Sequence, residues 1–178
     1  VEYTKFLIDN GYTFYSQTDT EVIPNLINFY YKKENDFLKA VKIACDDLKG
    51  SFALEVICKD FPNNMIVVRK DSPLVIGRGL DENYISSDIP AILSFTKDFY
   101  FLNDREFAVL SRDNIDFYDN ELNKIDKVVK SIEWNTASAE KDGYDDFMLK
   151  EIYEQPNAIR ETIGSKLSEG KISFNNFE

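Results

Sequence analysis

The first fifty positions carry apolar residues at the spacing of amphipathic helices. One apolar stripe follows the spacing i, i+1, i+4, i+5 and i+8 and consists of Val22, Ile23, Leu26, Ile27 and Tyr30. Before it, a short apolar run ends at Gly11, a residue type that is common at helix C-termini. After it, Asn35 is a favourable N-cap for a second stripe, which consists of Phe37, Leu38, Val41, Ala44, Cys45 and Leu48 and stops before Gly50. The pattern predicts one helix before Gly11 and two later helices that lie side by side.

From Ser51 onward the period changes from helical to extended. Residues 52–58 are predicted to form a largely buried strand, and a turn at 61–64 joins it to a hairpin partner at 65–69. Further strands are predicted at 74–77, 84–87, 99–102, 106–110 and 115–118, with a short extended piece at 12–15. A short helix is expected after Asp88, because Pro90 then falls in its first turn.

The C-terminal part of the chain has a different pattern. The strand pattern breaks at Trp134 and a polar loop is expected over 135–143. The pattern predicts a helix over 147–163, which Pro156 should kink or restart. The last dozen residues are predicted to be a linker or frayed tail. Together the elements predict an α+β layered domain without an internal repeat.

Composition and charge narrow the function classes. The 178 residues suit one domain, and 32 acidic against 21 basic residues give a net charge of −11. Nucleic acid is not expected as a partner, because the lysines alternate with acidic residues and form no basic stripe. No apolar run reaches the roughly 20 residues of a membrane span, so no membrane partner is expected. The start at Val1, without an initiator Met or signal peptide, indicates a piece of a longer, cytoplasmic protein.

Residues that could carry chemistry are few, because the chain contains no histidine. Cys45 and Cys58 lie on apolar faces and are expected to be buried, inert thiols. Gly77-Arg78-Gly79 is better explained as a turn than as a phosphate-binding loop, and Glu151 with Glu154 as a solvated helix face. No metal site and no cofactor is predicted.

The segment Ser16 to Ile23, "SQTDTEVI", allows two interpretations. Thr18 and Glu21 fit the T-x-x-E capping box. In that motif the threonine side chain accepts the backbone N–H of the glutamate, and the glutamate side chain accepts the backbone N–H of the threonine. Pro24 complicates a helix that begins after Thr18, because its missing N–H would fall beyond the first turn. A later helix start would leave Asp19 outside the helix with a free carboxylate. The cap is the more economical interpretation from pattern alone.

Several stretches together resemble one family. "GYTFYSQTDTEVIPNLI", "LKGSFALEVI", "RKDSPLVIGRG", "ENYISSD" and "KDGYDDFMLKEIYEQPNAI" have the order and spacing of the glucosamine-6-phosphate synthase family, the glutamine–fructose-6-phosphate transaminases. The resemblance implies an N-terminal nucleophile (Ntn) hydrolase fold, an αββα four-layer sandwich with antiparallel sheets, incomplete at its N-terminus. Residues 1–146 would be the C-terminal part of the glutamine amidotransferase domain. Residues 147–178 would be a helix and connector toward absent sugar-phosphate isomerase domains.

The resemblance also implies a mechanism whose catalytic residues lie outside this chain. The family's nucleophile is an N-terminal cysteine that uses its own α-amine as base, so neither internal cysteine is a candidate and the chain alone should be inactive. One binding residue carries over: Asp19 occupies the position that recognises the α-ammonium of L-glutamine. The whole enzyme would be a cytoplasmic homodimer that passes ammonia from glutamine to fructose 6-phosphate bound by the isomerase domains.

Two positions depart from the family pattern. Pro24 replaces a small residue and leaves the helix start open, and Asp146 replaces a histidine at the domain junction.

A second hypothesis for the function is a non-catalytic, amidotransferase-like binding or regulatory domain. A third, the purine-pathway amidotransferase, is disfavoured because "KEIYEQP" leads toward isomerase-type domains.

Overall fold

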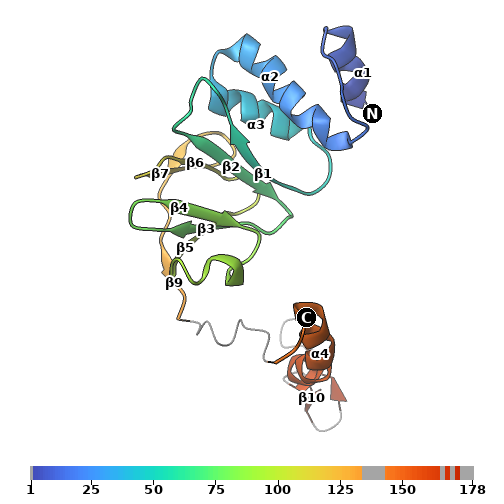
Figure 1. The fold of residues 1–178 in the computed structure, drawn as a ribbon, viewed down its shortest axis with the longest axis vertical. Helices are drawn as coiled ribbons and strands as arrows, with labels where there is room; N and C mark the ends of the chain where they lie inside the picture. Colours follow the sequence, from blue (N-terminus) through green and yellow to red (C-terminus); the bar gives the residue numbers. More distant parts are fainter. Residues whose placement is uncertain (1, 134–142, 165–166, 169–170, 173–178) are drawn as a thin grey trace. The chain divides into compact units, whose positions relative to one another are not determined.

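The computed structural model describes residues 2–133, 143–164, 167–168 and 171–172 (Figure 1). The chain divides into two compact units, Val1–Glu133 and Trp134–Glu178, which are described separately below. The break at Trp134 and most of the predicted polar loop lie outside the described residues. The predicted boundary between 146 and 147 is an assignment of domains by family resemblance and stays a prediction.

The N-terminal unit begins with three helices and a short 3-10 turn. They are α1 (Glu2–Asp9), η1 (Asp19–Glu21), α2 (Val22–Glu34) and α3 (Phe37–Asp47). The N-cap of α3 is Asp36, whose carboxylate accepts the Lys39 N–H at 3.0 Å. The prediction of Asn35 in that role is wrong by one residue: Asn35 ends α2 in the left-handed conformation, with φ 53°, which asparagine adopts more readily than most residues. The predicted extended piece at 12–15 forms no strand.

Two antiparallel sheets follow. The first has the order β1-β2-β6-β7-β8, from Phe52–Ile57, Met65–Lys70, Phe107–Leu110, Ile115–Tyr118 and Lys124–Ile125. The second has the order β4-β3-β5-β9, from Asn83–Ser86, Val75–Arg78, Asp98–Phe101 and Lys130–Ser131. The strands predicted from 52 to 118 are thus confirmed to within about two residues, and the short helix expected after Asp88 is the 3-10 turn η2 (Pro90–Ile92).

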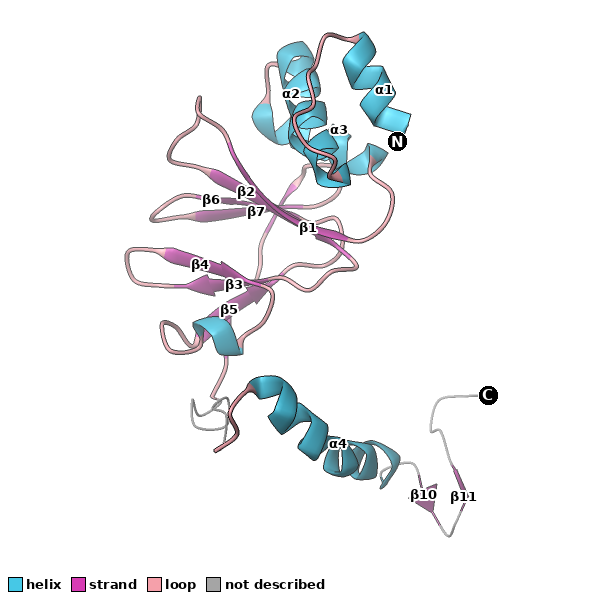
Figure 2. Ribbon diagram, turned by 45° about the vertical axis from the view of Figure 1, so that its right-hand side comes forward, coloured by secondary structure: helices cyan, strands magenta, loops and turns pink. Residues whose placement is uncertain are grey.

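Strand β2 shows how the layers are built, because its side chains alternate between two cores. Ile66 and Val68 point toward α2 and α3 and pack with Phe107 in the core beneath these helices. Val67 points the other way, into a core between the two sheets that also contains Leu74. Figure 2 shows the resulting order: helices, first sheet, second sheet. A continuous apolar run is expected of a strand that is covered on both faces.

The outer face of the second sheet carries a third core. Val75 and Phe99 pack there against Ile92 and Leu93 of the η2 segment. In residues 2–133 the order is therefore helices, sheet, sheet and a short 3-10 segment, in agreement with the α+β prediction. Strand β1 is less buried than predicted, because only one of its faces packs on the helices; Ile57, on the other face, is 74% exposed.

The C-terminal unit contains helix α4 (Phe147–Gly164) and a short antiparallel hairpin of β10 (Leu167–Ser168) and β11 (Lys171–Ile172). The carboxylate of Asp146 accepts the Leu149 N–H at 2.7 Å and so caps α4. Helix α4 continues through Pro156, so of the two predicted effects of the proline the restart does not occur, and the kink stays a prediction. The prediction of a structureless tail is wrong at the paired residues of the hairpin.

Candidate functional site

The loop before α2 is held together by the carboxylate of Glu21. Its Oε1 accepts the Tyr15 N–H at 2.8 Å, and its Oε2 accepts both the Ser16 N–H at 2.7 Å and the Ser16 hydroxyl at 2.6 Å. The hydrogen bonds from Ser16 and from the Tyr15 amide hold the pKa of Glu21 below its ordinary value. Glu21 is therefore ionised at neutral pH and can accept all three hydrogen bonds.

The capping box predicted for this segment is not formed. Thr18 precedes the 3-10 turn, but its side chain makes no capping hydrogen bond, and Glu21 reaches back to residues 15 and 16 instead of to Thr18. The reason is that α2 begins at Val22, three residues later than the pattern indicated. Pro24 then lies in the first turn, where a backbone N–H has no partner within the helix. The proline is thus accommodated without a lost hydrogen bond.

Asp19, the predicted binding residue, opens the 3-10 turn and is exposed. Within the part of the chain that the structure describes, its carboxylate makes no hydrogen bond or ion pair. It lies in the wall of a pocket of about 680 Å³, large enough for an amino acid. The other lining residues come from α1, the start of α2, the end of α3 and the start of β1: Tyr3, Thr20, Val22, Ile23, Asp47, Leu48, Lys49, Ser51, Phe52, Ala53 and Leu54.

Sequence patterns gave no signal for two other charged residues that line the pocket, Asp47 and Lys49. Asp47 is the last residue of α3 and Lys49 lies two residues after it, and the packing of the helices places both in the same pocket as Asp19. Asp47 accepts a short hydrogen bond from the Tyr30 hydroxyl of α2. Burial and the neighbouring carboxylate raise the pKa of Tyr30, so this hydroxyl stays a donor at neutral pH. The pocket thus has one carboxylate without a partner among the described residues, Asp19, and one that accepts a hydrogen bond, Asp47.

The other candidates from the sequence have structural roles. Cys45 is 2% exposed, and burial raises the pKa of its thiol to about 12; Cys58 is half-buried. Gly79 donates its N–H to the Glu82 carbonyl at 2.9 Å, which confirms a turn after β3. Glu151 and Glu154 are both exposed. Among the described residues no group of three or more potential ligands could hold a metal ion.

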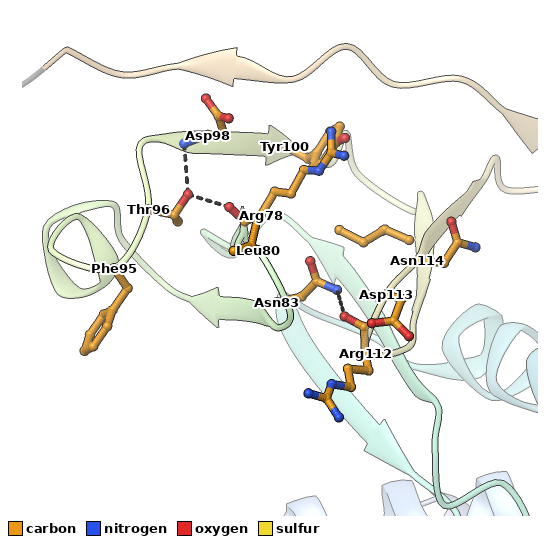
Figure 3. A pocket seen from close by; sticks show the side chains of 12 residues that line it. Arg78, Leu80, Asn83, Phe95, Thr96, Asp98, Tyr100, Arg112, Asp113 and Asn114 are labelled. Atoms are coloured by element: carbon orange, nitrogen blue, oxygen red, sulfur yellow. Dashed lines mark hydrogen bonds between the residues drawn. The ribbon is translucent and has the colours of Figure 1, made fainter.

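A second pocket of about 500 Å³ lies where the turn after β3 meets the turn between β6 and β7 (Figure 3). Arg78 and Asp98 line it on one side, and Arg112 and Asp113 line it on the other. Its cations and carboxylates are equal in number. Arg78 and Gly79, which the sequence explained better as a turn than as a phosphate-binding loop, line this pocket, whereas Asp19, the predicted substrate-binding residue, does not. The pocket beside Asp19 is therefore the candidate site. None of the described helices is long and apolar enough to cross a membrane.

Comparison with curated proteins decides the family. Glutamine–fructose-6-phosphate aminotransferase [isomerizing] of Clostridium perfringens is 51% identical over 170 residues, which are 96% of this chain and 28% of that protein. The Clostridium tetani protein of the same name is 45% identical over 179 residues, 100% of this chain and 29% of that protein. The chain belongs to the glutamine–fructose-6-phosphate aminotransferase family. It spans less than a third of the length of these relatives, and no protein-family model matches it.

A solved structure agrees on the fold. The glutamine phosphoribosylpyrophosphate amidotransferase of B. subtilis, complexed with ADP and GMP, has a TM-score of 0.55 and 21% identity, covering 69% of this chain and 27% of that one. The predicted Ntn-hydrolase type of α+β fold is confirmed by this likeness. At this identity the likeness bears on the fold alone. The family assignment rests on the aminotransferases.

Proposed function

We propose that this chain carries the ammonium-binding wall of a glutamine site in a longer enzyme. That enzyme would hydrolyse glutamine and transfer the ammonia to fructose 6-phosphate, as the names of its relatives indicate. The observation that carries the proposal is the position of Asp19: an exposed carboxylate without a partner among the described residues, in the wall of a pocket large enough for an amino acid.

The chemistry of the wall supports an α-amino acid as ligand. An ammonium group beside a fixed carboxylate forms a charge-assisted hydrogen bond, which is stronger than a neutral one. A ligand without the amine would leave Asp19 without this partner and would bind more weakly. The carboxylate and amide of glutamine would be held by parts of the enzyme beyond this chain, which also would supply the nucleophilic cysteine. We propose that residues 147–178 connect to the isomerase domains and that the enzyme acts as a homodimer.

The experiment is the Asp19→Asn substitution in the full-length enzyme, with glutamate release measured at varied glutamine concentration. The change keeps the shape of the side chain and removes the charge. We expect the KM for glutamine to rise about 10- to 150-fold, because a hydrogen bond to a charged group contributes roughly 1.5–3 kcal/mol. Thermal stability should change little, since Asp19 is exposed and binds no described residue.

The matched control is Asp81→Asn, which removes an exposed carboxylate that does not line this pocket. It should leave the KM unchanged. If Asp19→Asn kept the wild-type KM and instead melted at a lower temperature, Asp19 would have a structural role and the proposal would be wrong. The 178-residue chain alone should release no glutamate above a blank without protein, and measurable turnover would place a nucleophile within it.

A further inference from the structure

The hydrogen bonds around Glu21 surround Asp19 on both sides in the sequence. Ser16 lies three residues before Asp19 and Glu21 two residues after it, and three hydrogen bonds join segment 15–16 to the Glu21 carboxylate. No backbone–backbone hydrogen bond is described for residues 13–17. The Glu21 carboxylate is therefore the main constraint on the shape of the loop that presents Asp19.

The direction of each hydrogen bond follows from the available protons. The ionised Glu21 carboxylate can only accept, so the single proton of the Ser16 hydroxyl is directed to Glu21. In the 2.8 Å contact between Ser16 Oγ and Thr18 Oγ1, Thr18 must then be the donor. The Thr18 N–H also donates to Ser16 Oγ, at 3.3 Å. A chain of donors thus runs from Thr18, the residue directly before Asp19, to Glu21.

We infer that Glu21 is a positioning residue for glutamine recognition, which holds Asp19 at the place where the substrate ammonium binds. The inference rests on the proposed function and adds a residue to it. Glu21 does not line the pocket and acts through the loop alone. Loss of its charge would let the loop move and would weaken the contact between Asp19 and the ammonium. The chemistry at the side-chain amide would be unaffected, because other parts of the enzyme perform it.

The test compares two ligands that differ in one group. Glutamine has an α-ammonium, whereas glutaric acid monoamide has the same amide and carboxylate without it. In the full-length Glu21→Gln enzyme we expect the KM for glutamine to rise about tenfold, with kcat within about twofold of wild type. The inhibition constant of the monoamide against glutamine should stay within about twofold. Ser16→Ala, which removes one of the three hydrogen bonds, should give a smaller rise of about threefold.

The matched control is Asp119→Asn in the turn between β7 and β8. Asp119 is the same kind of group: it accepts the N–H of Glu121 and of Asn123 and the side-chain amide of Asn123 at 2.8–3.0 Å. Its hydrogen bonds likewise hold its pKa below the ordinary value. Asp119 does not line the Asp19 pocket. Its loss should therefore change neither the KM for glutamine nor the inhibition constant of the monoamide.

The possible outcomes separate the inference from the proposed function. If Glu21→Gln weakened the binding of glutamine and of the monoamide equally, Glu21 would have a general structural role and the inference would be overturned. The inference would also be overturned if Glu21→Gln changed neither the KM for glutamine nor the inhibition constant of the monoamide. The proposed function would still stand in that case if Asp19→Asn abolished the preference for glutamine over the monoamide. If Asp19→Asn kept the preference, the proposed function itself would fail.

Discussion

Gly77, in strand β3 of the second sheet, leaves little room for an added methyl group. A Cβ there would lie 2.7 Å from Thr96 Cγ2 and 3.0 Å from Ile92 Cδ1. The Ile92 methyl is the end of a flexible side chain and can move. Thr96 cannot rotate freely, because its hydroxyl donates to the Arg78 carbonyl at 2.5 Å and accepts the Asp98 N–H at 3.1 Å (Figure 3). Gly77→Ala should therefore strain or break this connection between β3 and β5.

The expected cost follows from two opposing effects. Overpacking a tight site typically costs about 1–3 kcal/mol. Replacing glycine restricts the unfolded chain and returns about 0.4–1 kcal/mol. We expect Gly77→Ala to lower the free energy of unfolding by about 1–2 kcal/mol, measured by urea denaturation of the 178-residue chain followed by circular dichroism.

Thr96→Ser provides the decisive second variant, because it removes Cγ2 and keeps the hydroxyl and both of its hydrogen bonds. In a double-mutant cycle the two changes should couple favourably by about 1 kcal/mol. Gly11→Ala is the contrasting control: its φ of +84° strains any L-residue, yet no atom lies within 4 Å of the new Cβ, so Thr96→Ser should not relieve it. The reasoning fails if Gly77→Ala is as stable as wild type, or if the cycle shows no coupling.

Two further predictions concern pH. The pKa of Cys45 is raised to about 12 by burial, so its contribution to stability is complete below the unfolded value near 9 and is lost as pH rises toward 12. Between pH 9 and 11 the free energy of unfolding of the wild type should fall relative to Cys45→Ala, with a slope approaching about 1.4 kcal/mol per pH unit; parallel curves would contradict this. For Glu106, burial raises the pKa, but hydrogen bonds from Lys127 and Asn103 outweigh it and leave the pKa lowered. Glu106→Gln should cost about 2 kcal/mol at pH 7, since a hydrogen bond to a charged group contributes roughly 1.5–3 kcal/mol. The difference should be lost as pH falls below the ordinary value of 4.5 and through the lower folded pKa; a constant difference down to about pH 3 would refute the assignment.

The elements of this fold were predictable where one local pattern determines them. The apolar stripes gave α2 and α3, and the apolar run around Val67 gave the hairpin partner of β1, although not the covering of both its faces. The order of the strands was not predictable, because β2 pairs with β6, about forty residues later in the chain, and nothing local to either strand selects that partner. The burial of β1 was overestimated because residues 52–58 are nearly all apolar. Only one face of the strand is covered by described residues.

The candidate site depended on the resemblance, because pattern alone had a sufficient structural explanation for the residues around Asp19. A capping box accounts for Thr18 and Glu21 and assigns no role to Asp19, which lies between them. Asp47 and Lys49 are unremarkable at the end of a helix, and only the packing of α3 beside α2 places them in the same pocket as Asp19. Sites assembled from distant segments leave no spacing in the sequence from which they could be found.

Pro24 links the local pattern to the site. If α2 began at Asp19, Pro24 would lie inside the helix and would remove the hydrogen bond from its own N–H to the Thr20 carbonyl. The observed start at Val22 avoids that loss, because the first four N–H groups of a helix need no internal partner. Glu21 then lies at the helix boundary and not in its first turn, which lets its carboxylate reach back to segment 15–16. Asp19 is left outside α2, at the start of the 3-10 turn and in the wall of the pocket. By excluding an earlier start of α2, Pro24 thus helps to fix the loop that presents the proposed substrate contact.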